Sequence, residues 1–326
     1  MSDVRILHRS NLLAAALLAA ALAVCPSDAV GQRPPITALA FAPDGRSLVC
    51  ASQAGLQVLH WPSLKPSRRL APPDVNLHDL AFAPGRDRLA VAGGTPSESG
   101  TVTILAWPKL DVLQTLAGHT DSVMAVVWLD QGHVAAGALD HAIGVFDTTT
   151  GKRTATLSGH SRGVRGLCVL GQQQMLVSSG MDSSLRVWKP DGRKSPLARS
   201  LNQHIRPVRA VRLRPANSGL PLVASISEDR TVRFWQPTIG RMVRFARLTS
   251  RPLDAAWLPD GSGVAISCVD GHVRIVDPAT VRVTHDVTGV ARWAHAITVH
   301  PSDGSVAVGG HNGEVKRIRF RGAVAP

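Results

Sequence analysis

Residues 157–189 read LSGHSRGVRGLCVLGQQQMLVSSGMDSSLRVWK, and this stretch decides the fold. An apolar stretch ends in a large aliphatic residue, and a short strand of small residues, a tight polar turn and a strand ending in Val-Trp follow it. Asp, Ser and Gly favour tight turns, whereas Val and Trp favour a pleated, packed surface. The pattern therefore predicts antiparallel strands rather than a helix.

The same unit recurs along the chain at intervals of about 40 residues, the length of a four-stranded propeller blade. Outside the N-terminal region no segment has a sustained helical period, so we predict an all-β, seven-bladed β-propeller of four-stranded antiparallel blades. One repeat cannot bury its apolar face alone, so residues 30–326 should form a single domain. The residue that ends the first strand of each blade is Phe41, Phe82, Trp128, Val169, Leu213, Trp257 or Val299.

Ring closure is the least regular part of the pattern. The last clear strand, residues 314–320, is followed by only six residues. The N-terminal piece that would add an outer strand lies near residues 25–30, and Pro34 and Pro35 disfavour a strand after it. We therefore predict a last blade with three firm strands and a closure looser than the other blade contacts.

Five strings in the repeats resemble the WD-repeat family: LAGHTDSV, LSGHSRGV, SGMDSSLRVWK, SISEDRTVRFWQ and ALDHAIGVFD. The resemblance covers residues 36–320 and is most specific over 118–236. Periplasmic propellers of six to eight blades are the alternative fold. They share the Pro-Asp-Gly turns but do not account for the Gly-His pairs that end at His119 and His160.

The resemblance implies buried structural networks in which His, Ser, Asp and Trp tie the strands of one blade together. Such a set invites a Ser-His-Asp hydrolase interpretation, but a triad needs an exposed hydroxyl beside an oxyanion site, and buried polar groups are paired. We predict no catalytic residue. Carried over by position, the fourth blade uses His160, Ser178, Asp182 and Trp188, the fifth uses His204, Ser225, Asp229 and Trp235, and the third keeps His119 and Asp140 but has Ala136 and Phe146.

The resemblance also implies that partners bind across the top face, through two positions in each blade. On the innermost strands these positions are Thr37, His78, Met124, Arg165, Arg209, Leu253 and His295. Before the turn acid they are Gln53, Glu98, Leu139, Met181, Glu228, Val269 and His311, and Trp293 lies close to His295 in sequence. Deformable apolar side chains with Arg anchors suit an interaction surface. We expect a protein segment to bind the arc Met124, Leu139, Arg165, Met181 and Arg209, with Glu228, Leu253, Trp293, His295 and His311 as further contacts.

The N-terminus predicts export. Arg5, His8 and Arg9 precede an apolar run over residues 12–24, which matches the core of a secretory signal and is short for a membrane span. Cleavage after Ala29 gives a signal peptide of residues 1–29 and a periplasmic or extracellular domain without stable membrane insertion. An uncleaved anchor or lipidation of Cys25 remains open as an alternative. We thus expect an exported, bacterial-type member of the family.

No metal or cofactor is predicted. Cys50, Cys168 and Cys268 fall in three non-adjacent blades, so we expect free thiols. His295, His300 and His311 are close in sequence, but strand alternation places His295 and His300 on opposite faces, and rim histidines are the simpler interpretation.

The net charge of +13 is consistent with an acidic partner or with an Arg-rich surface that has no single target. Ten arginines between residues 206 and 251 form the densest basic zone. Export and the lack of interleaved aromatic residues argue against nucleic acid. We expect a monomeric ring.

Two classes of function follow from these patterns. A protein–protein interaction scaffold needs only a binding face. A propeller enzyme, such as a hydrolase or a quinoprotein, needs carboxylates, a metal set or a cofactor clamp in the central funnel. The mapped positions supply only the scattered Glu98 and Glu228, so the scaffold is our prediction and the periplasmic enzyme the alternative.

Overall fold

The computed structural model describes residues 33–326 apart from 72–75, 191–195, 216–218 and 321–326. The predicted signal peptide and Cys25 lie outside the described residues. The described residues form 27 strands and one 3-10 turn, η1 (Gly171–Gln173). None of them belongs to an apolar helix long enough to cross a membrane.

The strands of the described chain form seven antiparallel sheets in sequence order, and we number these blades 1 to 7. Blade 1 contains β1 (Ile36–Phe41), β2 (Ser47–Ser52), β3 (Gly55–His60) and β4 (Lys65–Leu70). Blade 2 contains β5 (Asn76–Phe82), β6 (Arg88–Thr95), β7 (Ser99–Ala106) and β8 (Val112–His119). Blade 3 contains β9 (Val123–Trp128), β10 (His133–Ala138), β11 (Ile143–Asp147) and β12 (Arg153–Leu157).

The remaining blades repeat this order. Blade 4 contains β13 (Val164–Leu170), β14 (Met175–Gly180), β15 (Leu185–Trp188) and β16 (Leu197–Leu201). Blade 5 contains β17 (Val208–Leu213), β18 (Val223–Ser227), β19 (Thr231–Gln236) and β20 (Arg241–Arg247). Blade 6 contains β21 (Pro252–Trp257), β22 (Val264–Cys268), β23 (His272–Val276) and β24 (Val283–Thr288). Blade 7 contains β25 (Ala294–Val299), β26 (Val306–Gly310) and β27 (Val315–Ile318).

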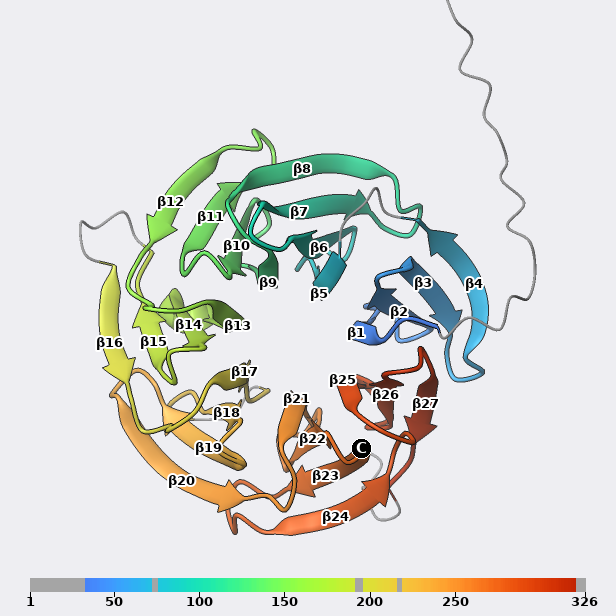
Figure 1. Ribbon diagram of the computed structural model, residues 1–326, viewed down its shortest axis with the longest axis vertical. Helices are drawn as coiled ribbons and strands as arrows, with labels where there is room; N and C mark the ends of the chain where they lie inside the picture. Colours follow the sequence, from blue (N-terminus) through green and yellow to red (C-terminus); the bar gives the residue numbers. More distant parts are fainter. Residues whose placement is uncertain (1–32, 72–75, 191–195, 216–218, 321–326) are drawn as a thin grey trace, which may run out of the picture. The chain divides into compact units, whose positions relative to one another are not determined.

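The blades surround a central channel. The first strand of each blade lies next to the channel, and the fourth lies at the periphery (Figure 1). The prediction of an all-β, seven-bladed propeller is confirmed, and so is the prediction of a last blade with three strands among the described residues. The predicted first-strand ends also hold, since six of the seven first strands end at the predicted residue and β13 extends one residue further, to Leu170.

Each junction between neighbouring blades has its own buried hydrophobic cluster. Between blades 3 and 4, for example, Ile143 and Ala125 pack with Val164 and Trp188. Within the described residues, seven such clusters occupy the seven junctions. A small sheet with two apolar faces must bury both of them. Each blade does so because it packs between its two neighbours.

Within the described residues, blades 7 and 1 share no sheet, and they meet through side chains. Ile36 packs so closely on blade 7 that an added Cβ at Gly309 would lie 2.5 Å from it. His300 Nε2 lies 3.0 Å from the carbonyl oxygen of Gly45, and its ring stacks on Trp61. The Arg317 guanidinium sits 5.0 Å from the centre of the Trp61 ring. His300 is therefore buried in this junction and is not a rim residue, while the looser closure stays a prediction.

The three cysteines in the described part of the chain are free and buried. Burial disfavours their thiolate forms, so the pKa of Cys50 and of Cys168 is raised to about 12 and that of Cys268 to about 11.

Candidate functional site

Four side chains of blade 4 form one buried hydrogen-bonded chain. His160 Nδ1 lies 2.9 Å from Asp182 Oδ2, and His160 Nε2 lies 2.7 Å from Ser178 Oγ. The indole Nε1 of Trp188 donates to the same Ser178 oxygen at 2.8 Å. The loop that enters the blade is thereby tied to its second and third strands.

Blade 5 repeats this chain with nearly the same distances. His204 bridges Asp229 and Ser225 at 2.8 Å each, and Trp235 Nε1 donates to Ser225 at 2.8 Å. Burial alone would raise the pKa of Asp229, but hydrogen bonds from His204 and Thr231 hold it well below its ordinary value. The acid is thus a permanent anion that accepts hydrogen bonds.

These networks are closed to substrate. Ser178 and Ser225 are both 0% exposed, and each hydroxyl already accepts a hydrogen bond from an indole. A nucleophilic serine needs an open hydroxyl facing an oxyanion site. The geometry therefore favours a structural role over hydrolysis.

Blade 3 lacks part of this chain. His119 Nδ1 still lies 2.8 Å from Asp140 Oδ2, but the second nitrogen, Nε2, is buried and has no partner in the described part of the chain. Ala136 occupies the position of the missing hydroxyl, and Phe146 replaces the indole. One buried nitrogen is left unsatisfied as a result.

The innermost strands carry a feature that the sequence did not reveal. In all seven, the second strand pairs with residues on both sides of one position and skips it, which is the register of a β-bulge. Bulges free a side chain from the ladder and re-aim it. The skipped residues are Thr37, His78, Met124, Arg165, Arg209, Leu253 and His295, and all seven line the central cavity of ≈ 880 Å³.

We call these seven bulge residues the channel mouth. They are the seven innermost-strand positions that the family resemblance indicated for binding. The bulge gives a physical reason for that choice, because the backbone register of the second strand skips each of these residues. The Thr37 hydroxyl nevertheless donates to the carbonyl oxygen of Ala51 in β2 at 3.1 Å. Whether a partner binds them stays a prediction.

Among the residues predicted before the turn acids, Leu139 and Met181 lie close together, and Glu228 lies beside the channel mouth. An added Cβ at Gly163 would lie 2.7 Å from Leu139 Cδ2 and 3.3 Å from Met181 Sδ, so both side chains close over this glycine. Glu228 Oε1 accepts from Arg209 Nη1 at 3.2 Å. Four of the predicted contacts are therefore brought into two adjacent pairs.

Three further predicted contacts, Trp293, His295 and His311, lie at blade 7, and Leu253 is the bulge residue of β21 in blade 6. Trp293 is 52% exposed, and its ring meets that of His295 edge-on at 5.8 Å. Trp293 and His311 line a second, smaller cavity of ≈ 410 Å³. His311 Nδ1 is buried there without a partner. An exposed indole beside a cavity is typical of an interaction surface.

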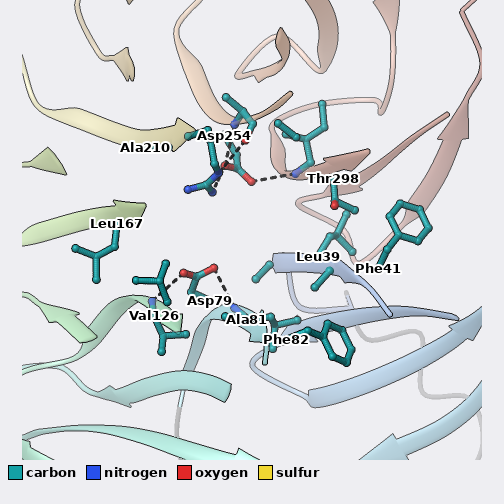
Figure 2. A pocket seen from close by; sticks show the side chains of 18 of the residues that line it. Leu39, Phe41, Asp79, Ala81, Phe82, Val126, Leu167, Ala210, Asp254 and Thr298 are labelled. Carbon is teal, nitrogen blue, oxygen red and sulfur yellow. Dashed lines mark hydrogen bonds and ion pairs between the residues drawn. The ribbon is translucent and has the colours of Figure 1, made fainter. Parts of the chain in front are cut away.

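The channel interior holds two carboxylates that the sequence analysis missed (Figure 2). Asp79 accepts from the backbone amides of Leu80 at 2.9 Å and of Val126 in the next blade at 3.0 Å. Asp254 accepts from Arg212 Nη2 at 2.8 Å and from the amide of Ile297 in the next blade at 3.1 Å. Each carboxylate therefore joins one blade to its neighbour.

Burial raises the pKa of Asp79 to about 6, although the charge of Arg212 opposes the rise. A signal for both acids was present in the repeat. The other five blades have a small residue at the same position, namely Ala38, Ala125, Gly166, Ala210 and Ala296.

The basic zone is divided by the fold. Arg212 is used inside the channel, and Arg214 lies over the ring of Trp257 and donates to the carbonyl of Gly261. The exposed arginines of β20 stand at the periphery of blade 5. The ten arginines therefore do not form one surface.

Comparison with known proteins agrees with this architecture. Residues 110–147 and 151–189 match the family described as WD domain, G-beta repeat. The chain is thus a seven-bladed β-propeller that contains WD repeats. The matches support its membership of a WD-repeat family.

Three relatives show the extent of the similarity. The chain is 32% identical over 142 residues to the nuclear distribution protein nudF of Aspergillus flavus, which is 43% of this chain and 30% of the relative. It is 28% identical over 184 residues to the nuclear distribution protein PAC1 of Yarrowia lipolytica, covering 50% and 41%. It is 30% identical over 143 residues to a ribosome biogenesis protein WDR12 homolog of Ixodes scapularis, covering 44% and 33%.

The chain thus spans less than half the length of each of these relatives.

Proposed function

We propose that this protein is a non-catalytic scaffold that binds a protein segment across its channel mouth. The observation that supports this proposal is the set of seven bulges. They present one side chain from every blade at one end of the channel. Met124, Leu139 and Met181 supply adaptable apolar contacts, and Arg165 and Arg209 supply charged ones.

The test is capture of partners by the purified chain, followed by mass spectrometry. The combined change Met124→Ala, Leu139→Ala and Met181→Ala removes apolar contact area beside the channel mouth. Loss of hot-spot contacts weakens binding strongly, so we expect the captured partner to be depleted at least about tenfold. The matched control, Arg241→Ala, Arg244→Ala and Arg247→Ala, changes three side chains of the peripheral strand β20 and should leave capture intact. Undiminished capture by the first variant, with an unchanged melting temperature, rejects the proposal.

We also propose that the protein is exported, as a bacterial-type member of its family. The support is the apolar run over residues 12–24, preceded by basic residues and followed by small residues before Val30. N-terminal sequencing of the native protein should find Val30 first. A chain that keeps Met1 and fractionates with the cytosol contradicts export. A chain that keeps residues 12–24 in the membrane fraction, or a lipidated Cys25, selects tethering instead.

A further inference from the structure

One cation at the channel mouth forms no ion pair within the described residues. Arg209 is paired with Glu228 at 3.2 Å. Deeper in the channel, Arg212 is paired with Asp254 at 2.8 Å. Arg165 also lines the cavity, yet its side chain forms no hydrogen bond or ion pair with any described residue. A partly buried guanidinium left without an anion is costly, because burial weakens its hydration.

The groups around Arg165 also favour the binding of an anion. Burial, and then the nearby charge of Arg209, lower the pKa of Arg165 to about 10. Burial and the charge of Arg165 lower the pKa of His78 to about 4, so this imidazole is neutral at neutral pH. In the described structure His78 Nε2 is buried and has no hydrogen-bond partner. His78 and Arg165 line the same cavity, and the charge of Arg165 acts on His78, so an anion held by Arg165 can also interact with this imidazole.

The charges below the channel mouth limit how deep an anion can enter. Asp79 and Asp254 line the channel interior, where Arg212 offers one positive charge to both carboxylates. Further anions are repelled from that level. At the mouth, Glu228 offsets the charges of Arg165 and Arg209, and the deeper Asp254 also acts on Arg209. Arg251 adds a further positive charge, so the balance there is positive. The field thus favours an anionic group held at the entrance.

We propose that the channel mouth binds a side-chain carboxylate of an acidic peptide segment, with Arg165 as its main cation and His78 as a second hydrogen-bonding group. This inference rests on the proposed function, whose partner it describes as acidic. A peptide is the occupant that fits, because the apolar side chains of Met124 and Leu253 line the same cavity as Arg165 and can contact the rest of the segment. Trp293 offers a further exposed apolar contact at the second cavity. The net charge of +13 attracts such a partner over long range.

The test uses fluorescein-labelled hexaglutamate and its uncharged counterpart hexaglutamine as probes of the full chain, with fluorescence anisotropy as the readout. We expect hexaglutamate to bind and hexaglutamine not to bind. Removing one member of a desolvated charge pair is costly, so Arg165→Met should weaken hexaglutamate binding about tenfold or more. The matched control is Arg162→Met, an exposed arginine three residues away in the same blade, which should change affinity by less than about twofold. Equal affinity of wild type and Arg165→Met overturns the inference.

A second measurement guards against a folding artefact and against nonspecific anion binding. The imidazole resonances of His78 should shift when hexaglutamate is added to the wild type, and should not shift in Arg165→Met of unchanged melting temperature. Sodium phosphate at matched ionic strength should compete more weakly than unlabelled hexaglutamate. Equal competition means that the site accepts any anion, and the acidic-peptide inference is then wrong.

The two proposals fail in different ways. If Arg165→Met still binds hexaglutamate, the anion site is wrong, and capture of the natural partner by the apolar contacts is untouched. If the Met124, Leu139 and Met181 variant keeps its partner, the scaffold surface is wrong, whereas the contact between Arg165 and hexaglutamate stands on its own readout.

Discussion

Blades 4 and 6 solve the same problem in opposite ways. In both, an aspartate follows the second strand, and its carboxylate needs partners. In blade 4, Asp182 accepts from His160 and Ser184 and from the backbone of the entering loop. In blade 6, Arg274 donates to Asp270 through two nitrogens, at 3.1 and 2.8 Å, and its Nε donates to Asp286 at 3.0 Å.

The two blades share only the turn acid. In blade 4 its partners include His160 and the backbone of the entering loop, whereas in blade 6 its side-chain partner is Arg274 of β23. The blade 4 network joins the entering loop to β14 and β15, and it is buried. The blade 6 network joins β23 to β24 and is more open, since the side chains of Asp270 and Asp286 are 35% and 43% exposed. Solvent screening weakens an ion pair, so the second network should contribute less stability.

The largest effect that separates the two blades comes from removing the acids. Asp182→Ala leaves His160 and a backbone amide without their acceptor in a buried site, and we expect a loss of about 3–5 kcal/mol in the free energy of unfolding. Asp270→Ala acts in a more exposed site and should cost about 1–2 kcal/mol. Urea unfolding of both variants measures the difference. Equal losses show that burial does not distinguish the two networks.

A smaller effect tests the arginine of blade 6. The Arg274 side chain is only 5% exposed and bonds two acids, so Arg274→Met should cost about 1–3 kcal/mol. The equivalent residue of blade 4, Arg186, stands 3.8 Å from Asp182 and is the matched control. Arg186→Met should cost less than about 1 kcal/mol. If the control is as damaging as the test variant, the arginine of blade 6 has not replaced the histidine.

The fold of these blades could be predicted from the sequence because it depends on short-range sequence features. Turn residues and β-branched residues recur with the length of a blade, and a sheet with two apolar faces must be stacked. The three-stranded last blade, as it stands among the described residues, was predicted by counting the six residues after Phe320. None of this required knowing which side chains meet.

The contacts between repeats were harder to predict. Asp254 was overlooked and Arg212 was placed in a surface zone, because their meeting depends on neighbouring blades. His300 was interpreted as a rim residue for the same reason. An alternating pattern of residues does not reveal a bulge, because one skipped residue does not change the composition of the strand. For blades 4 and 5, the hydrogen bonds run between the residues named from the family resemblance, whereas Arg274 of blade 6 was not named at all.

The pH dependence of stability offers a third comparison. Burial lowers the pKa of His204 more than its hydrogen bond to Asp229 raises it. The folded pKa is below the unfolded value of about 6.5, so the contribution of neutral His204 is complete above that pH and is lost as the pH falls. We expect a lower urea midpoint at pH 5.5 than at pH 7.5, and a smaller difference in His204→Gln.

His78 and His295 also have lowered pKa values and act in the same direction, so the pH dependence should shrink in the variant and not vanish. Asp79 acts against them, because its raised pKa stabilises the folded state as the pH falls. Blade 6 has no histidine bonded to its turn acid through a side chain in the described structure. An unchanged pH dependence in His204→Gln means that the blade 5 network does not titrate with folding.

The smallest expected effect is an increase in stability. Blade 3 has the histidine and the acid of blade 4 but not the hydroxyl, and His119 Nε2 is left unpaired. Ala136→Ser places a hydroxyl where Ser178 stands in blade 4, and we expect about 0.5–1 kcal/mol of added stability. Ala135→Ser, on the opposite face of the same strand and inside an apolar cluster, is the control and should destabilise. Destabilisation by both rules out the proposed equivalence of blades 3 and 4.

The seven bulges have an evolutionary consequence. A residue that takes no part in the ladder can change its chemistry without disturbing the strands on either side. The ring therefore carries seven positions at which recognition can diverge while the framework is inherited intact. A combinatorial library randomised at these codons should yield mostly folded rings with new specificities, whereas randomising the adjacent small residues should not.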